Sequence, residues 1–137
     1  MARASFSFSK QESEAFGYVA RPIIRVTLRA ESGELFDTTA LLDSGADISM
    51  FSPSVAEIMG LKVRRGNRKI FRGLGGKVEA YLHRIHFNVG PLQFHARVAF
   101  PTVEIPNLVG RLDVMKDVDV IFKDERQVSL VSRARTA

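Results

Sequence analysis

The chain has 137 residues, 45% of them hydrophobic, and a formal net charge of +5. This length predicts one domain, and the apolar fraction suffices for a real core. The absence of cysteine excludes disulfides, and no apolar run approaches the roughly 18 residues of a membrane-spanning helix. The first residues lack the apolar core of a signal peptide, so we expect the cytoplasm by default, one domain over 1–131 and a frayed tail over 132–137.

The N-terminal segments alternate in a way that predicts short strands. Ser and Phe alternate over 4–8, and the polar segment 10–14 is expected to be a loop. Apolar and polar residues then alternate along 18–29, which predicts a strand with one buried face. The turn residues of 31–34 separate it from a returning strand at 35–42, so a β-hairpin is the simplest arrangement.

The segment 52–60 has the signals of a short helix. Ser52 is a good N-cap, Pro53 suits the first helical position, and Gly60 suits the stop. The apolar side chains between these signals share one face of the expected helix. The segment therefore predicts a helix that packs against a core.

The second half of the chain again consists of short alternating runs. Pro101 ends one of them because proline cannot donate to a sheet. A helical turn or two is expected over 111–117. The expected strands are 78–89, 92–100, 106–109, 118–122 and 127–131. Together with the N-terminal strands, they predict an all-β, barrel-like domain with one or two short helices.

The stretch 40–50 holds the first chemical motif. Its apolar start ends abruptly at Asp43, followed by Ser44 and Gly45. A buried strand that delivers a carboxylate to its own tip is costly, because an unpaired buried charge is disfavoured. The alternative is an Asx turn that merely closes the strand.

Two further stretches bear on that choice, namely the glycine-rich 73–76 and the apolar run 105–111 that ends in Gly110-Arg111. In this order and spacing, the three stretches resemble the retropepsin family of aspartic proteases. In that family an apolar pair precedes Asp-Ser/Thr-Gly-Ala, a glycine-rich flap follows, and a second apolar pair precedes Gly-Arg. The likeness covers roughly Pro22 to Val131, and the helix after the motif points to the cellular members.

The resemblance implies a closed acid-protease β-barrel that forms a homodimer and hydrolyses peptide bonds. Amide hydrolysis needs one group to take a proton from water and another to give one to the carbonyl oxygen. This chain has one Asp-Ser-Gly, because Asp113, Asp117 and Asp119 lack the following Ser/Thr-Gly. The second catalytic carboxylate is therefore expected to be the Asp43 of a second subunit.

The family pattern also implies roles for other residues. The Ser44 hydroxyl would bond across the dimer, the Gly45 backbone would face substrate, and Leu74 at the flap tip would hold a water. The terminal strands of two subunits would interleave. The residues expected to bind substrate are Ala46, Asp47, Ile48, Gly73, Leu74, Gly75 and Leu108.

Asp47 lies in a wall that we expect to be partly buried, where a carboxylate needs a cation. The resemblance suggests Arg111 of the same subunit and Arg21 of the opposite one. The chain departs from the family where Leu112 separates Arg111 from Asp113, because the family often has an acid or amide directly after the arginine.

Two other functions remain open. One is a proteolytically weak dimerisation or binding module of the same fold. The other is a nucleic-acid-binding β domain that uses the basic stretch 62–77, although Phe71 is its one aromatic residue. We expect no metal or other cofactor, because His83, His86 and His95 are few and scattered and no phosphate-binding loop is present.

Overall fold

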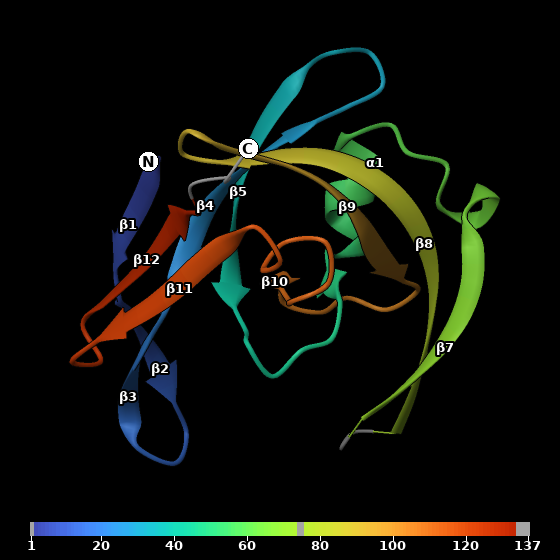
Figure 1. The fold of residues 1–137 in the computed structure, drawn as a ribbon. Helices are drawn as coiled ribbons and strands as arrows, with labels where there is room; N and C mark the ends of the chain where they lie inside the picture. Colours follow the sequence, from blue (N-terminus) through green and yellow to red (C-terminus); the bar gives the residue numbers. More distant parts are fainter. Residues whose placement is uncertain (1, 74–75, 134–137) are drawn as a thin grey trace.

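The computed structural model describes residues 2–73 and 76–133, and most of them form strands (Figure 1). One sheet has the strand order β4-β5-β10-β6-β9-β8-β7. Its bounds are β4 Ile23–Arg29, β5 Leu35–Leu42, β6 Ser49–Met50, β7 Asn67–Gly73, β8 Gly76–Val89, β9 Leu92–Pro101 and β10 Leu108–Val109. Because β4 also pairs with β8, six of the strands close into a barrel, as the sequence predicts.

The β4–β5 hairpin shows how alternation builds this barrel. The apolar phase of β4 is buried inside, where Ile24, Val26 and Leu28 are at most 1% exposed. The opposite phase faces out, and the Thr27 hydroxyl donates to the Asp37 carboxylate on the paired strand at 2.6 Å. The predicted hairpin is therefore confirmed, and it carries the chain into Asp43.

A short helix, α1 (Pro53–Ile58), covers the barrel after β6. The Ser52 hydroxyl accepts the Val55 N–H at 3.4 Å, and Gly60 stops the helix with φ +69°. Both predicted signals are confirmed. A 3-10 turn, η1 (Val63–Arg65), follows. Residues 111–117 form turns in which Val114 and Met115 donate to the Arg111 carbonyl, so the expected helical turn is a single one that does not continue into a helix.

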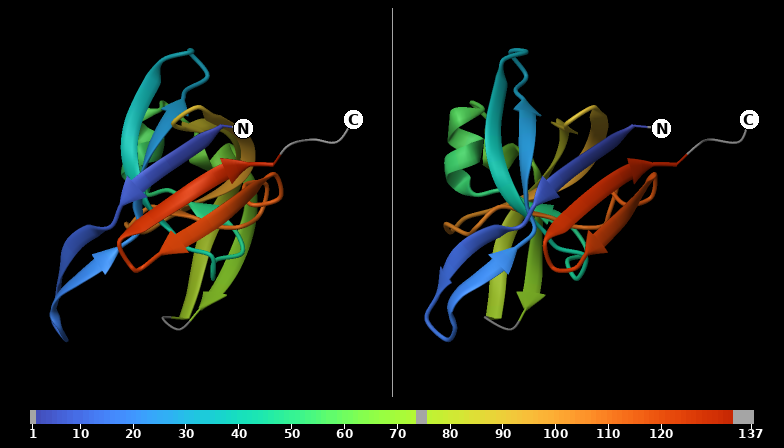
Figure 2. Two further views of the ribbon diagram at one scale, coloured as in Figure 1. Left: turned by 60° about the vertical axis from the view of Figure 1, so that its left-hand side comes forward. Right: turned by 90° about the vertical axis from the view of Figure 1, so that its left-hand side faces the viewer.

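The two ends of the chain lie in a separate sheet, of order β1-β12-β11 (Figure 2). Its strands are β1 (Arg3–Ser7), β11 (Val118–Lys123) and β12 (Gln127–Ser132). The predicted terminal strands thus pair with each other within one subunit. Ser132 still belongs to β12 and Arg133 bonds Asp119 at 3.0 Å, so the tail is ordered that far. The rest of the predicted tail, 134–137, lies outside the described residues.

A two-stranded hairpin of β2 (Ser9–Ser13) and β3 (Gly17–Arg21) stands apart from both sheets (Figures 1 and 2). We call it the arm. The expectation of a loop over 10–14 is wrong, because polar residues form an exposed strand here. The expected continuous strand over 18–29 is interrupted at Pro22, which has no N–H to donate to a ladder. None of the helices in the described ranges is long and apolar enough to cross a membrane.

Candidate active site

The Asp43 turn follows directly from the pairing of two strands. β5 and β10 run parallel, with Leu41 opposite Leu108 and Leu42 opposite Val109. The ladder continues one residue further, because the Asp43 N–H donates to the Val109 carbonyl at 2.9 Å. The buried apolar ends of both strands thus hold the backbone of Asp43 while its side chain is only half-buried.

The turn itself orients the carboxylate. The Gly45 N–H donates to Asp43 Oδ1 at 2.9 Å, and the Ala46 N–H donates to the Asp43 carbonyl at 3.1 Å. A Cβ added at Gly45 would lie 3.2 Å from the same Oδ1, which explains why the smallest residue stands there. Among the described residues, no ion pair engages Asp43. The carboxylate is therefore aimed by a backbone donor and left without a cation.

The Gly110-Arg111 segment holds this turn in place through backbone hydrogen bonds. The Arg111 N–H donates to the Ala46 carbonyl at 3.0 Å, and the Leu112 N–H donates to the Asp47 carbonyl at 2.9 Å. The Gly110 N–H donates to the buried Ser49 hydroxyl at 3.0 Å. A Cβ at Gly110 would lie 2.7 Å from the carbonyl group of Ile48, so the two loops touch only because this residue is glycine.

Asp47 pairs with Arg111, as predicted for a single subunit. The expectation of partial burial is wrong, because 89% of the Asp47 side chain and 54% of the Arg111 side chain are exposed in the subunit. Arg21 lies at the end of β3 and is half-buried. Its predicted contact with the Asp47 of another subunit stays a prediction.

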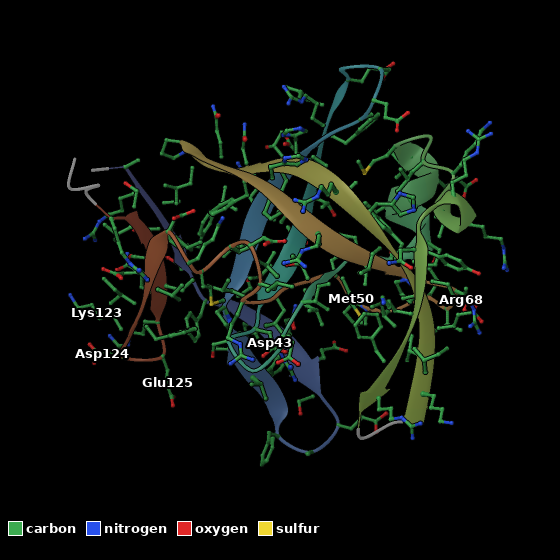
Figure 3. The ribbon with its side chains drawn as sticks, turned by 45° about the vertical axis from the view of Figure 1, so that its right-hand side comes forward. Asp43, Met50, Arg68, Lys123, Asp124 and Glu125 are labelled. Carbon is green, nitrogen blue, oxygen red and sulfur yellow. The ribbon has the colours of Figure 1, made fainter. Side chains whose placement is uncertain are left out.

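A small apolar cluster lies between the turn and the β7–β8 hairpin. It consists of the buried Ile48, Ala80 and Ala99, with Met50, Phe71 and Leu82 packed against them. Ile48 comes from the turn and Phe71 from β7, so the cluster joins the two. Figure 3 shows Met50 between Asp43 and β7. These side chains form an apolar wall beside the carboxylate. Ala46, in the same turn, and Leu108, opposite Leu41, are half-buried.

The β7–β8 hairpin occupies the position predicted for the flap. Gly73 pairs with Gly76, whose φ is +104°, and the predicted Leu74 and Gly75 lie outside the described residues. Much of the basic stretch 62–77 is on this hairpin. Arg68 is bonded to Glu79 at 3.0 Å, and that bond lowers the pKa of Glu79.

Asp113 has a structural role that sequence reasoning missed. Its Oδ2 accepts the Arg97 backbone N–H at 3.0 Å and Nε–H at 2.8 Å, while Oδ1 accepts a third bond at 3.1 Å. These bonds lower the pKa of Asp113 to about 2. The signal available in the sequence was the extra residue Leu112, which moves Asp113 out of the family position and toward β9.

The histidines occupy two separate places. His83 Nε2 lies 2.7 Å from the Val63 carbonyl, whereas His86 and His95 stack across β8 and β9 with ring centroids 3.9 Å apart. Burial is the main cause that lowers the pKa of His86, and the neighbouring His95 adds to it. No group of three metal-ligating side chains gathers within 2–73 and 76–133.

A family model described as aspartyl protease matches residues 26–121. The chain belongs to this retropepsin-like aspartic protease family. The matched span contains the Asp43 turn, the β7–β8 hairpin and Gly110-Arg111. It begins within β4 and ends within β11, so the arm and both terminal strands lie outside it. No curated protein matches the chain.

Proposed function

We propose that this aspartyl protease family member is a homodimeric endopeptidase whose two Asp43 carboxylates, one from each subunit, activate a water. The observation that carries the proposal is the Asp43 turn, which presents a half-buried carboxylate that is aimed by the Gly45 N–H and has no cationic partner within the described ranges. The family match over residues 26–121 supports the same chemistry.

The proposed mechanism is defined by which carboxyl group takes and which gives each proton. The ionised Asp43 takes a proton from water, and the resulting hydroxide attacks the peptide carbonyl. The protonated Asp43 gives its proton to the carbonyl oxygen. As the C–N bond breaks, the Asp43 that took the water proton passes it to the leaving nitrogen, and the hydroxyl of the intermediate returns its proton to the other Asp43. Two carboxylates placed together share one proton, because both cannot be ionised at short range. One subunit supplies only one of them, so the site is completed by a second copy.

The remaining predicted residues have roles in that dimer. Ser44, which is exposed, bonds across the two-fold axis, and the exposed Gly45 offers backbone to the peptide. Leu74 at the flap tip holds a water over the substrate carbonyls. The wall beside Asp43 binds apolar substrate side chains. The expected compartment is the cytoplasm, and the natural substrates are proteins or peptides.

The test is cleavage of a mixed peptide library by the purified protein over a range of pH. We expect internal cleavage of peptides with apolar residues beside the cut. A folded dimer that leaves the library intact would instead indicate the dimerisation or binding module. Salt-dependent retention of DNA or RNA in the same preparation would indicate the nucleic-acid-binding function.

A further inference from the structure

The arm has almost no core of its own. Its two strands pair from Ser9–Arg21 to Ser13–Gly17, and no residue of either strand is fully buried. An isolated two-stranded hairpin is marginally stable in water, and at least one further strand or a packing partner is needed to support it. The arm therefore has the properties of an element that another surface covers.

The end of the arm carries two exposed aromatic side chains. Phe16 is 80% exposed and Tyr18 is 57% exposed. Lys10 Nζ lies 4.3 Å from the centre of the Tyr18 ring, so a cation covers one part of that ring while Phe16 stays open. Aromatic residues are enriched at protein interfaces because they bury a large apolar area with few rotatable bonds.

The direction of the arm identifies the covering surface. In all three figures the arm and the flap hairpin extend beyond the Asp43 turn, toward the bottom of the picture. A second subunit that brings its Asp43 beside the first would approach the turn from the side toward which both projections extend. Such a copy would lie within reach of the arm.

We propose that the arm is a clasp that packs on the second copy of this chain, with Phe16 and Tyr18 as its anchors. The proposal rests on the proposed function, because the need for two Asp43 residues brings the second copy to this side of the barrel. The family match begins after the arm, at residue 26. The match therefore assigns no role to the arm, and the clasp is argued from the arm's own residues.

The test compares two double variants of the full-length protein. Phe16→Ser with Tyr18→Ser removes the anchors. Leu35→Ser with Ile58→Ser is the matched control, since these residues are 63% and 61% exposed and lie away from the Asp43 turn. Sedimentation and peptide cleavage are measured over a series of protein concentrations, and circular dichroism checks folding.

We expect the arm variant to raise the dimer dissociation constant by about tenfold or more, as removal of interface anchors does. Its cleavage rate should recover at high protein concentration, and the control should dimerise like the parent. An arm variant that dimerises like the parent overturns the clasp but leaves the proposed function intact. If such a variant loses only its affinity for substrate, the arm binds substrate instead.

A second measurement does not depend on weakening the dimer. A photoreactive benzophenone amino acid in place of Phe16 should crosslink one copy to another on irradiation. A dimeric protein that yields no crosslinked pair overturns the clasp. A parent that stays monomeric and cleaves nothing at any concentration overturns the proposed function and the clasp together.

Discussion

Asp43, which directly follows β5, and Asp113, in the turns after β10, differ in what surrounds their carboxylates. Asp43 accepts one backbone N–H, from Gly45, and has no cationic partner among the described residues. Asp113 accepts three bonds from Arg97 and its side chain is only 15% exposed. The family pattern includes both regions. The groups bonded to each carboxylate decide whether it can exchange a proton with a reacting group.

The difference has a chemical consequence. Because Arg97 lowers the pKa of Asp113 to about 2, this carboxylate is ionised throughout the working range of a protein and cannot serve as an acid. Asp43 has no such cationic partner among the described residues. The region of Asp113 is suited to holding the chain together, whereas the proposed chemistry belongs to the Asp43 turn.

The largest expected effect is the loss of peptide cleavage when Asp43 is replaced. Asp43→Asn should lower peptide cleavage by roughly 1,000-fold or more, because an amide can neither accept nor give the proton. The folded state should persist, with an unchanged melting temperature. Asp113→Asn is the control, and it should retain cleavage at temperatures where it is folded. Turnover by purified Asp43→Asn would remove the catalytic role of this residue.

The shared proton predicts an acidic working range. Cleavage should be fastest on the acid side of neutrality and should fall as the second carboxylate of the pair loses its proton, since two ionised carboxylates leave no acid. The measurement is kcat/KM for one peptide over about pH 3–9. A rate that only rises from about pH 5 to 9 contradicts the shared-proton mechanism.

The second region predicts a stability effect. Asp113→Ala should lower the free energy of unfolding by about 2 kcal/mol at neutral pH, because Arg97 loses its partner and its backbone N–H is left unbonded. The pKa of Asp113 is lower in the folded protein than the ordinary 3.8. Its contribution is therefore present above about pH 4 and is lost as pH falls toward about 2.

Urea unfolding of parent and variant at pH 7 and at about pH 2.5 measures this contribution. The difference in unfolding free energy should shrink at the lower pH. An equal difference at both pH values would assign the effect to lost packing instead of lost charge.

The role predicted for the β7–β8 hairpin can be tested by comparing two glycines, one in it and one in the β4–β5 turn. Gly76 and Gly33 have φ of +104° and +90°, and a Cβ at either meets no atom within 4 Å. Valine at each position should cost about 1–2 kcal/mol in backbone strain. Melting temperatures should fall similarly, but only Gly76→Val should lower kcat/KM, because it alters the hairpin beside the Asp43 turn. Equal kinetics in the two variants would make the predicted flap an ordinary turn.

The smallest effect is expected at the Arg111–Asp47 pair. Both side chains are more than half exposed, so Arg111→Ala should cost less than about 1 kcal/mol in the isolated subunit. Urea unfolding of a monomeric preparation measures it. A loss as large as that of Asp113→Ala would show that this pair is less screened by water than its exposure indicates.

The sequence predicted the elements whose signals are local. The alternation of Ile24, Val26 and Leu28 marked β4, and Ser52 with Gly60 marked both ends of α1. The Asp43 turn was harder to interpret, because Asp-Ser-Gly alone also fits an Asx turn and the resemblance needed the distant stretches 73–76 and 105–111 as well.

The remaining features depend on distant partners. The bond between Arg97 and Asp113 joins β9 to the turns of 111–117, which only the folded barrel brings together, and alternation in β9 does not reveal it. The exposure of Asp47 depends on how far the loop between β5 and β6 extends from the barrel, which the local sequence does not specify. The β2 strand escaped prediction because its polar residues, from Ser9 to Ser13, have no apolar phase to detect.

The contact between Gly110 and Ser49 also affects how the protein folds, because it links two residues 61 positions apart. Closing so long a loop has an entropic cost that must be met before the contact contributes, and such pairings slow folding. The Asp43 turn takes its final form only after β10 has docked beside β5. A nascent chain that has not yet reached residue 110 therefore holds the Asp-Ser-Gly sequence without the bonds from Gly110 and Arg111 that fix the turn against the barrel.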